Sequence, residues 1–409
     1  MNLANFIFYV LLFIGFFLPT NSNMYIPFPG VLLKVNELAF LLLPIVNFFC
    51  TSSEKKNRIN RNLSKYIILY ILIVIITELL LKPLVFGQSL GDSVKSLRVG
   101  LPFMSSIIML YFGIKANIKT VWKVLLYAIG VSIVLSIISI YVDIPIYYNI
   151  DEQDILEATQ GRIMNSNASF GIIGLYLLFS DKDKWYNEGK LVKYVSILSV
   201  IMLILTFNRT YLALLVLEFL YLARNTISFK TISKLIFYPL FLFIITFFVY
   251  QNNDTIQRQI DKRILSIVFQ ENSLKETTID GNRDMIYEGV LQRINEGYWF
   301  LGLPYNTPIY INTSVFLKDF VPMNVTDTSL INVLLKYGIF PLFLFCLIFK
   351  QLFRIFKQKD NLKIILIVYF LASLNIDSLF RHNSVFFIVI IISLISLKIY
   401  DKNNLYSQN

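Results

Sequence analysis

The chain has 409 residues, of which 56% are hydrophobic and only 15% are charged. A soluble domain carries about 25% charged residues, so this composition excludes an ordinary soluble protein. The net charge of +11 is typical of some nucleic-acid-binding proteins, but most of the Lys and Arg residues lie in short segments between apolar runs. Cytoplasmic loops of membrane proteins have this distribution, which argues against nucleic acid as a partner.

Apolar runs of about 20 residues recur along the whole chain, and this is the helix length that crosses the hydrocarbon core of a bilayer. Lipid cannot satisfy backbone polar groups, so only helices and closed barrels span it, and runs without polar alternation favour helices. We therefore expect an all-α polytopic membrane protein with about 12 transmembrane helices. Residues 1–409 are expected to form a single integral-membrane domain.

The predicted spans are, in chain order, Asn5–Pro19, Val31–Cys50, Tyr66–Val85, Val99–Ile114, Val121–Val142, Ala168–Ser180, Tyr194–Phe207, Tyr211–Ala223, Leu235–Tyr250, Ser329–Phe349, Ile364–Ile376 and Val385–Leu397. Residues 251–327, between the ninth and tenth spans, form a large external loop, and loops of this length are usually functional. Within the loop the sequence predicts helices over Thr255–Phe269 and Arg283–Glu296, the second ended by Gly297.

The stretch from Val192 to Ala223 is apolar almost throughout and is interrupted only around Arg209. One long helix would fit this pattern. However, Lys193 and Arg224 both belong on the cytoplasmic side, which favours a tight hairpin with Arg209 at its outer apex.

The basic residues also predict the orientation of the chain. With both termini in the cytoplasm, the inner segments hold 22 of the 37 Lys and Arg residues, whereas the short outer loops hold only five. Because basic residues are enriched in cytoplasmic loops, this places the protein in the bacterial inner (cytoplasmic) membrane, with the large loop facing the periplasm or exterior. Cys50 and Cys346 fall on the cytoplasmic side, where a disulfide is not expected.

Several arginines fall on the predicted outer face, where their planar guanidinium groups suit the oxygens of a lipid-linked pyrophosphate. They are Arg98, Arg162, Arg209, Arg283 and Arg381. For Arg98 and Arg381, an interfacial anchor is an equally good explanation. An arginine between two apolar helices, such as Arg209, is more costly to keep.

Two other outer residues have alternative interpretations. Asp327 precedes a predicted helix, so it fits an N-cap as well as a catalytic carboxylate. His382, the single histidine, fits a base or hydrogen-bond donor near a sugar, and equally an interfacial residue. No cluster of His, Cys or carboxylates indicates a metal site, and no Walker or dinucleotide motif indicates a cofactor, so we expect neither.

Four segments form an ordered pattern along the chain. They are Gly161–Ala168, with an arginine and asparagines before a helix; Leu205–Ala213, with Arg209 after a helix; Asn282–Tyr287 followed by Trp299–Gly302 in the outer loop; and Asp327–Gly338 at the start of the next helix. Together they resemble the superfamily of O-antigen polymerases and O-antigen ligases, and the resemblance spans the chain from about Arg98 to the C-terminus. Ligases of this superfamily usually have a histidine where Asp327 stands, so the match favours a polymerase.

The resemblance implies polymerisation of oligosaccharide repeat units for an O-antigen, capsule or exopolysaccharide. The glycan would pass from undecaprenyl pyrophosphate to the terminal sugar hydroxyl of another lipid-linked unit. Arg209 and Arg283 would hold the pyrophosphate, and Asp327 would orient or deprotonate the acceptor hydroxyl. The implied substrate-binding residues are Arg98, Arg162, Asn167, Tyr287, Arg381 and His382. The expected partners are the undecaprenyl-pyrophosphate-linked oligosaccharide and the lipid bilayer, and the resemblance also allows a chain-length regulator.

Three other functions stay open. An O-antigen ligase-type transferase would move finished glycan to another acceptor. A polysaccharide flippase or transporter would require charged residues deep in its helices and a repeat between its halves, whereas here the ionisable residues are assigned to the outer ends. A non-catalytic scaffold would not depend on Arg209 or Arg283.

Overall fold

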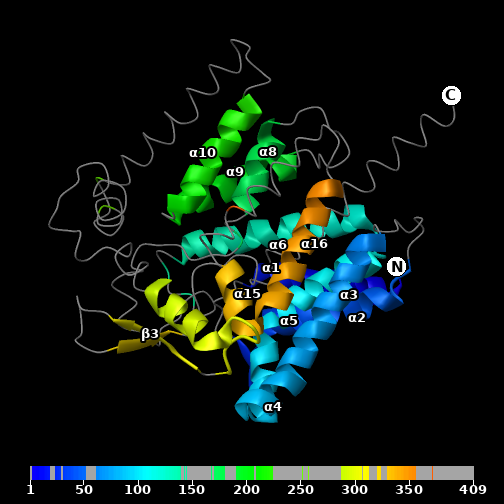
Figure 1. Cartoon of the computed structure of the whole chain (residues 1–409). Helices are drawn as coiled ribbons and strands as arrows, with labels where there is room; N and C mark the ends of the chain where they lie inside the picture. Colours follow the sequence, from blue (N-terminus) through cyan, green and yellow to red (C-terminus); the bar gives the residue numbers. More distant parts are fainter. Residues whose placement is uncertain are drawn as a thin grey trace. The chain divides into compact units, whose positions relative to one another are not determined.

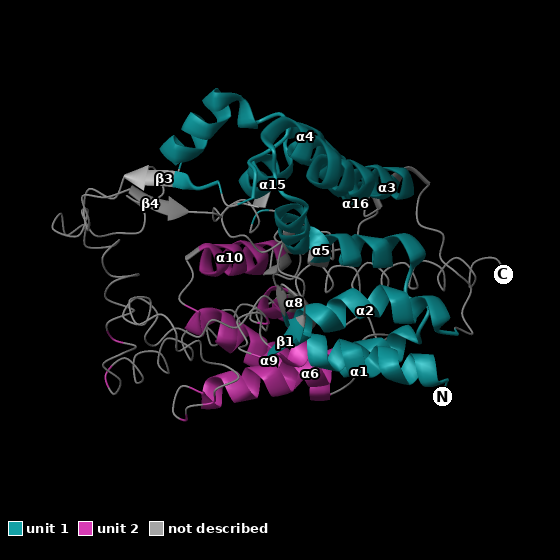
Figure 2. Ribbon diagram, turned by 90° about the horizontal axis from the view of Figure 1, so that it is seen from below, with its two compact units in different colours: residues 1–15, 25–124, 273–409 teal, residues 16–24, 125–272 magenta. Residues whose placement is uncertain are grey.

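The structure is a computed structural model (Figure 1). It describes residues 2–18, 24–28, 31–51, 61–139, 170–179, 190–206, 209–223, 287–305, 307–312, 320–323 and 329–355, with a few single positions besides. The described part is mostly helical, as predicted, and its strands form two short antiparallel hairpins that were not predicted. The chain divides into two compact units, which are coloured separately in Figure 2.

Unit 1 comprises residues 1–15, 25–124 and 273–409. Its described elements are α1 (Leu3–Phe17, whose last residues belong to unit 2), β1 (Tyr25–Phe28), β2 (Val31–Lys34), α2 (Val35–Phe49), α3 (Arg61–Ile76), η1 (Thr77–Leu81), α4 (Lys82–Phe86), α5 (Leu90–Phe112), a helix over 287–298 that includes η5 (Ile294–Tyr298), β3 (Ile309–Asn312), β4 (Phe320–Met323), α15 (Ser329–Tyr337) and α16 (Ile339–Ile355).

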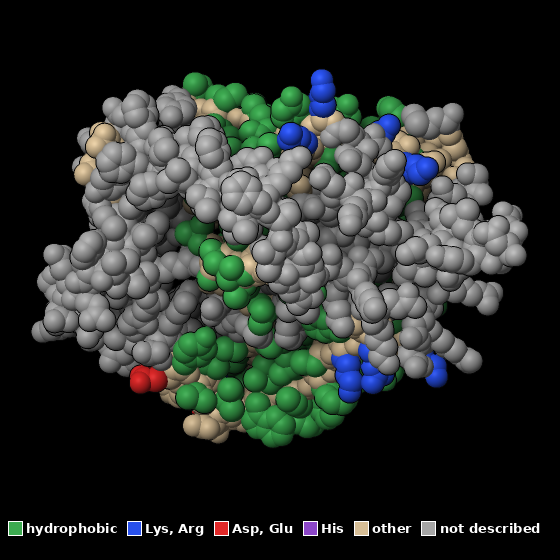
Figure 3. All heavy atoms as spheres, turned by 90° about the horizontal axis from the view of Figure 1, so that it is seen from above, with side chains coloured by type: hydrophobic (Ala, Val, Ile, Leu, Met, Phe, Trp, Pro, Cys, Tyr) green, Lys and Arg blue, Asp and Glu red, His purple; other side chains and the backbone are tan. Residues whose placement is uncertain are grey.

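Two helices of the described part are long and apolar enough to cross a membrane, namely Leu63–Phe86 and Ile118–Ile138. The first joins α3, η1 and α4, and the second is α6. Leu72 and Leu84 leave 49% and 80% of their surface exposed, which suits contact with lipid. Hydrophobic side chains make up most of the coloured surface on the face drawn in Figure 3.

Aromatic residues form the core of unit 1 where α3, α5 and α16 meet. The ring of Phe103 lies 5.4 Å from that of Tyr70 and 5.2 Å from that of Phe345, centroid to centroid. All three side chains are buried. On the other side of α5, the hydroxyl of Ser105 donates a hydrogen bond of 2.6 Å to the carbonyl of Phe40 in α2. These contacts hold α5 between its neighbours.

Unit 2 comprises residues 16–24 and 125–272 and contains the second part of α6 (Ile118–Ile138), α8 (Phe170–Phe179), α9 (Lys190–Leu205) and α10 (Arg209–Ala223). Helices α8 and α9 pack closely, because Gly171 and Gly174 face the backbone of α9. Helix α9 ends at Leu205 and α10 begins at Arg209, so the alternative of one long helix is wrong. The interruption lies where the sequence predicted it.

Three predicted boundaries differ from the structure. Val31–Lys34 is a strand, not the start of a span. Helix α5 begins at Leu90, so Lys95 and Arg98 are helical and do not lie in a short outer loop; the Ser89 hydroxyl caps this earlier start by accepting from the Asp92 N–H at 3.1 Å. The predicted span Ser329–Phe349 is divided at Gly338, whose φ is +86°.

Other predictions lie wholly or largely outside the described residues. They concern the spans Leu235–Tyr250, Ile364–Ile376 and Val385–Leu397 and the loop helix Thr255–Phe269. The total of about 12 spans stays a prediction, as does the external position of the loop 251–327. The helix predicted over Arg283–Glu296 is described from Tyr287 onward, and Gly297 near its end has a φ of +92°.

Cys50 and Cys346 are both free thiols, as predicted.

The packing of α8 on α9 predicts that Gly171→Ala destabilises the protein. The added Cβ would lie 2.6 Å from the carbonyl oxygen of Ser199, and a helix backbone cannot move aside easily. We expect a loss of about 1–3 kcal/mol, seen as a lower thermal unfolding temperature in detergent.

The matched control is Gly130→Ala, because the nearest atom to its added Cβ is a methyl carbon of Val195 at 3.1 Å. This side chain can adjust, so the control should unfold close to the wild-type temperature. A Gly171→Ala protein that is as stable as the control would contradict the close packing of α8 on α9.

Candidate functional site

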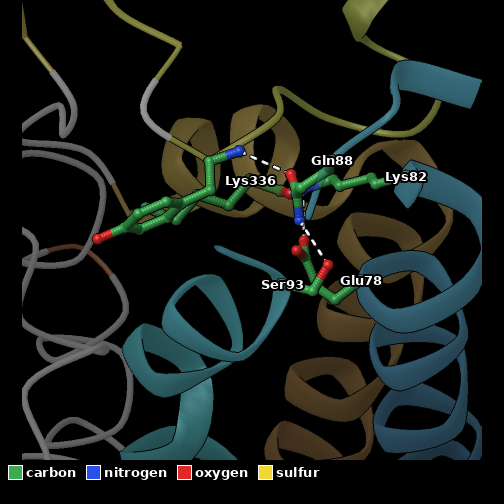
Figure 4. A network of polar contacts seen from close by, with 6 residues as sticks. Glu78, Lys82, Gln88, Ser93 and Lys336 are labelled. Atoms are coloured by element: carbon green, nitrogen blue, oxygen red, sulfur yellow. Dashed lines mark hydrogen bonds and ion pairs between the residues drawn. The ribbon is translucent and has the colours of Figure 1, made fainter. Parts of the chain in front are cut away.

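Charged side chains are buried in the membrane-length helix Leu63–Phe86. Glu78 in η1 and Lys82 at the start of α4 form an ion pair four residues apart, with both side chains fully buried. The Lys82 ammonium also donates a hydrogen bond to the carbonyl oxygen of Lys336, near the end of α15. Its Nζ lies 6.0 Å from the centre of the Tyr337 ring. Figure 4 shows this pair beside the end of α15.

Two polar atoms at this cluster have no hydrogen-bond partner within the part of the chain that the structure describes. They are Glu78 Oε2 and the Tyr337 hydroxyl, and both are buried. Buried polar atoms in native proteins are nearly always hydrogen-bonded, and exceptions are often found at functional sites. A π-turn such as η1 is also frequent at functional sites. The cluster is therefore a candidate site.

The segment 299–305 packs backbone against backbone on the junction between α15 and α16. The N–H of Leu303 donates to the carbonyl of Leu335. A Cβ on Gly302 would lie 2.5 Å from the Lys336 carbonyl oxygen, and one on Gly338 would lie 2.1 Å from the carbonyl oxygen of Phe300. Both glycines have a positive φ, +82° and +86° respectively. Glycine is therefore required at both positions by the backbone conformation and by the lack of space.

Contacts at both ends hold this segment against α4 and α5. The side-chain oxygen of Gln88 accepts from the Tyr305 N–H at 2.8 Å, and its side-chain nitrogen donates to the Ser93 hydroxyl at 2.9 Å (Figure 4). At the other end, the ring of Tyr298 packs on that of Phe86 with 5.6 Å between centroids. Segment 299–305 is thereby attached to the helices of unit 1 at both of its ends.

Arg98 lies on α5 and pairs with Glu37 of α2, with 3.0 Å between its NH2 nitrogen and Oε2. The two side chains are 30% and 20% exposed, so solvent weakens this ion pair. Two residues further on, Gly100 faces Tyr337, whose hydroxyl would lie 2.3 Å from an added Cβ. The two halves of α5, Leu90–Arg98 and Phe103–Phe112, meet at an angle of 63°. Pro102 lies within this bend and has no N–H to continue the helix ladder.

The other described site residues of the sequence prediction differ in their surroundings. Asn167 is buried in unit 2, where its amide donates to the Phe16 carbonyl and, at 3.1 Å, to the Ser132 hydroxyl. These bonds explain Asn167 by packing within unit 2. Arg209 is the first residue of α10. Tyr287 is 41% exposed on the helix 287–298 and shares no hydrogen bond with Arg98, which also belongs to unit 1.

Five predicted site residues lie outside the described part of the chain, namely Arg162, Arg283, Asp327, Arg381 and His382. Conversely, the sequence prediction missed Glu78, Lys82 and Tyr337. A signal was present, because a glutamate and a lysine four residues apart inside an apolar run are placed to pair on a helix. Within the described residues, no group of three or more His, Cys, Asp or Glu side chains could hold a metal ion.

Comparison of the chain with protein-family models, with curated proteins and with solved structures gives no significant match.

The junction predicts a large effect of Gly338→Ala on stability. The new Cβ would combine an unfavourable positive φ with a clash against the Phe300 carbonyl. We expect a loss of about 3 kcal/mol or more in the free energy of unfolding, measured by thermal or denaturant unfolding in detergent.

Gly87→Ala is the matched control, since Gly87 has a φ of +66° but no atom within 4 Å of its added Cβ. It should lose only about 1–2 kcal/mol, the cost of the left-handed backbone alone. Equal losses in the two variants would show that segment 299–305 does not pack on Gly338.

Proposed function

We propose that this protein is a membrane glycan polymerase that joins lipid-linked oligosaccharide repeat units. The observation that carries the proposal is the packing of segment 299–305 on the start of α16. Trp299–Gly302 and Asp327–Gly338 belong to the segments that resemble the polymerase and ligase superfamily. Gly302 of the first packs against the backbone of Lys336 and Tyr337, and Gly338 of the second packs against the backbone of Phe300 and Leu301. A resemblance spread over separate segments gains weight when two of them meet in space.

In the proposed reaction, the terminal hydroxyl oxygen of one lipid-linked unit attacks the anomeric carbon of the glycan on another. The bond from that carbon to the pyrophosphate oxygen breaks, and undecaprenyl pyrophosphate leaves with the electron pair. The hydroxyl proton passes to a base, for which Asp327 is the candidate. Arg209 and Arg283 would stabilise the charge that develops on the leaving pyrophosphate. The lipid pyrophosphate supplies the activation, so the reaction needs no nucleotide.

Arg98 would take part in binding the phosphate groups. In the structure one of its NH2 protons is directed to Glu37, and a guanidinium has five donors, so others can reach a phosphate oxygen. Arg162, Arg381 and His382 would complete a basic surface at the outer face of the inner membrane. The two membrane-length helices and the exposed apolar side chains of α3 and α4 support the membrane setting.

A polysaccharide flippase or transporter is a second candidate, and one observation favours it. The sequence argument against transport relied on charges lying only at the outer ends of helices, but Glu78 and Lys82 are buried within a membrane-length helix. Intramembrane ion pairs often mark transport pathways. Proteoliposomes separate the two functions, because a transporter moves labelled lipid-linked units across the bilayer without lengthening the glycan.

The proposed chemistry predicts that neutral arginine variants lose activity. Purified protein in liposomes with lipid-linked repeat units from the source cell should produce longer glycans without added nucleotide, scored as a ladder on a gel. Arg209→Gln and Arg283→Gln should each lower kcat by about 100-fold or more, since each removes a donor to the developing charge.

Lys350→Gln is the control, because it removes one exposed positive charge from α16, away from the proposed residues in the sequence. It should keep wild-type activity. Ladders of normal length from both arginine variants would exclude these residues from catalysis and favour a scaffold. Transfer of glycan to an acceptor other than a lipid-linked unit would instead identify a ligase.

A common active centre also requires that positions 209 and 283 face the same side of the membrane. In a Cys50→Ala/Cys346→Ala background, single cysteines at these positions should both react with a membrane-impermeant maleimide added to intact cells without an outer membrane barrier. Labelling of only one position would remove the shared centre and with it the polymerase proposal.

A further inference from the structure

The proposed chemistry makes no use of Glu78 and Lys82, although both are fully buried. Burying two opposite charges is costly, and a pair of apolar side chains of similar size often stabilises a protein as well or better. Stability alone therefore does not explain this pair. What an apolar pair could not provide is the directed hydrogen bond from the Lys82 ammonium to the Lys336 carbonyl.

The Lys336 carbonyl lies in the last turn of α15, where lysine side chains can hydrogen-bond to helix carbonyls. Here the lysine comes from a different helix, 254 positions away in the sequence. The same oxygen is the atom nearest to the added Cβ of Gly302, at 2.5 Å. Lys82 therefore binds the same peptide group against which segment 299–305 packs.

Helix α15 connects the Lys336 peptide group to the proposed base, Asp327, which precedes the helix in the sequence. It has only nine residues, Ser329–Tyr337, so holding its end also restricts its beginning. Asp327, the proposed base, precedes that beginning by two residues in the sequence. The Tyr337 hydroxyl and Glu78 Oε2 are both buried without a hydrogen-bond partner among the described residues.

We propose that Glu78 and Lys82 are positioning residues that hold the α15–α16 junction and segment 299–305 in the geometry needed for glycan transfer. Glu78 neutralises and orients the Lys82 ammonium, and Lys82 fixes the Lys336 peptide group. The catalytic consequence rests on the proposed function, whereas the positioning of the segment does not. The second part can therefore be tested without any activity.

The activity test uses the double variant Glu78→Leu/Lys82→Met. It removes both charges together, so no unpaired charge is left buried and the protein should fold, as checked by gel filtration and thermal unfolding. We expect kcat for glycan lengthening to fall at least tenfold while KM for the lipid-linked unit stays within about twofold, because positioning affects the transfer step more than binding. Lys82→Arg with Glu78 unchanged should recover part of the rate, since it restores a cation at this position.

The control is Lys350→Gln, which removes one exposed charge from α16 at a position 12 residues after Gly338. It should keep the wild-type kcat. A Glu78→Leu/Lys82→Met protein that folds and keeps the kcat of this control would overturn the positioning role.

The second measurement follows segment 299–305 directly. The rings of Phe300 and Phe340 lie in contact, 5.3 Å between centroids, so the thiols of Phe300→Cys/Phe340→Cys in the Cys50→Ala/Cys346→Ala background should be joined by a short bifunctional thiol reagent. The initial rate of cross-linking should fall at least fivefold when Glu78→Leu/Lys82→Met is added. An unchanged rate would show that the ion pair does not hold the segment and would overturn the proposal.

The two measurements separate the two claims. A slower cross-link together with a lower kcat supports the proposal, whereas a slower cross-link with an unchanged kcat overturns its catalytic part. If the wild-type protein lengthens no glycan but the cross-link still slows in the double variant, the proposed function fails and the positioning of the segment by Glu78 and Lys82 stands.

Discussion

The carbonyl group of Lys336 is the point at which three parts of unit 1 meet. Lys82 donates to it from the membrane-length helix, Gly302 approaches it from the large loop, and α15 ends beside it. Gly302 leaves room for this approach because it lacks a side chain, and Glu78 pairs with the buried ammonium. The Gln88–Tyr305 hydrogen bond and the Phe86–Tyr298 ring contact attach the neighbouring residues to the same helices.

Two buried charges, Glu78 and Lys82, lie within the membrane-length helix Leu63–Phe86 at this contact. An ion pair within an apolar helix is costly to bury, so it is kept where a directed polar contact is needed. In unit 1 that contact joins the membrane-length helix Leu63–Phe86 to the end of α15, against which segment 299–305 packs.

The bend in α5 links this contact to the predicted arginine site. Gly100 leaves room for the Tyr337 hydroxyl, and Arg98 lies half a turn earlier, paired with Glu37 of α2. Helix α5 thus places Arg98 within one helix turn of Gly100, the residue that faces Tyr337 at the junction. In unit 2 the buried side-chain amide of Asn167 donates to the Phe16 carbonyl and to the Ser132 hydroxyl.

The sequence by itself determined the helical class, the helix Leu63–Phe86 and the break between α9 and α10, because hydrophobic runs and their interruptions act locally along the chain. It also pointed to Gly302 and Gly338 through the resemblance. It did not predict that α5 begins at Leu90, since a run containing Lys95 and Arg98 becomes helical only with a cap and a partner on α2. Only the tertiary structure showed that Lys82 binds Lys336, because those residues are 254 positions apart and no local pattern records such a contact.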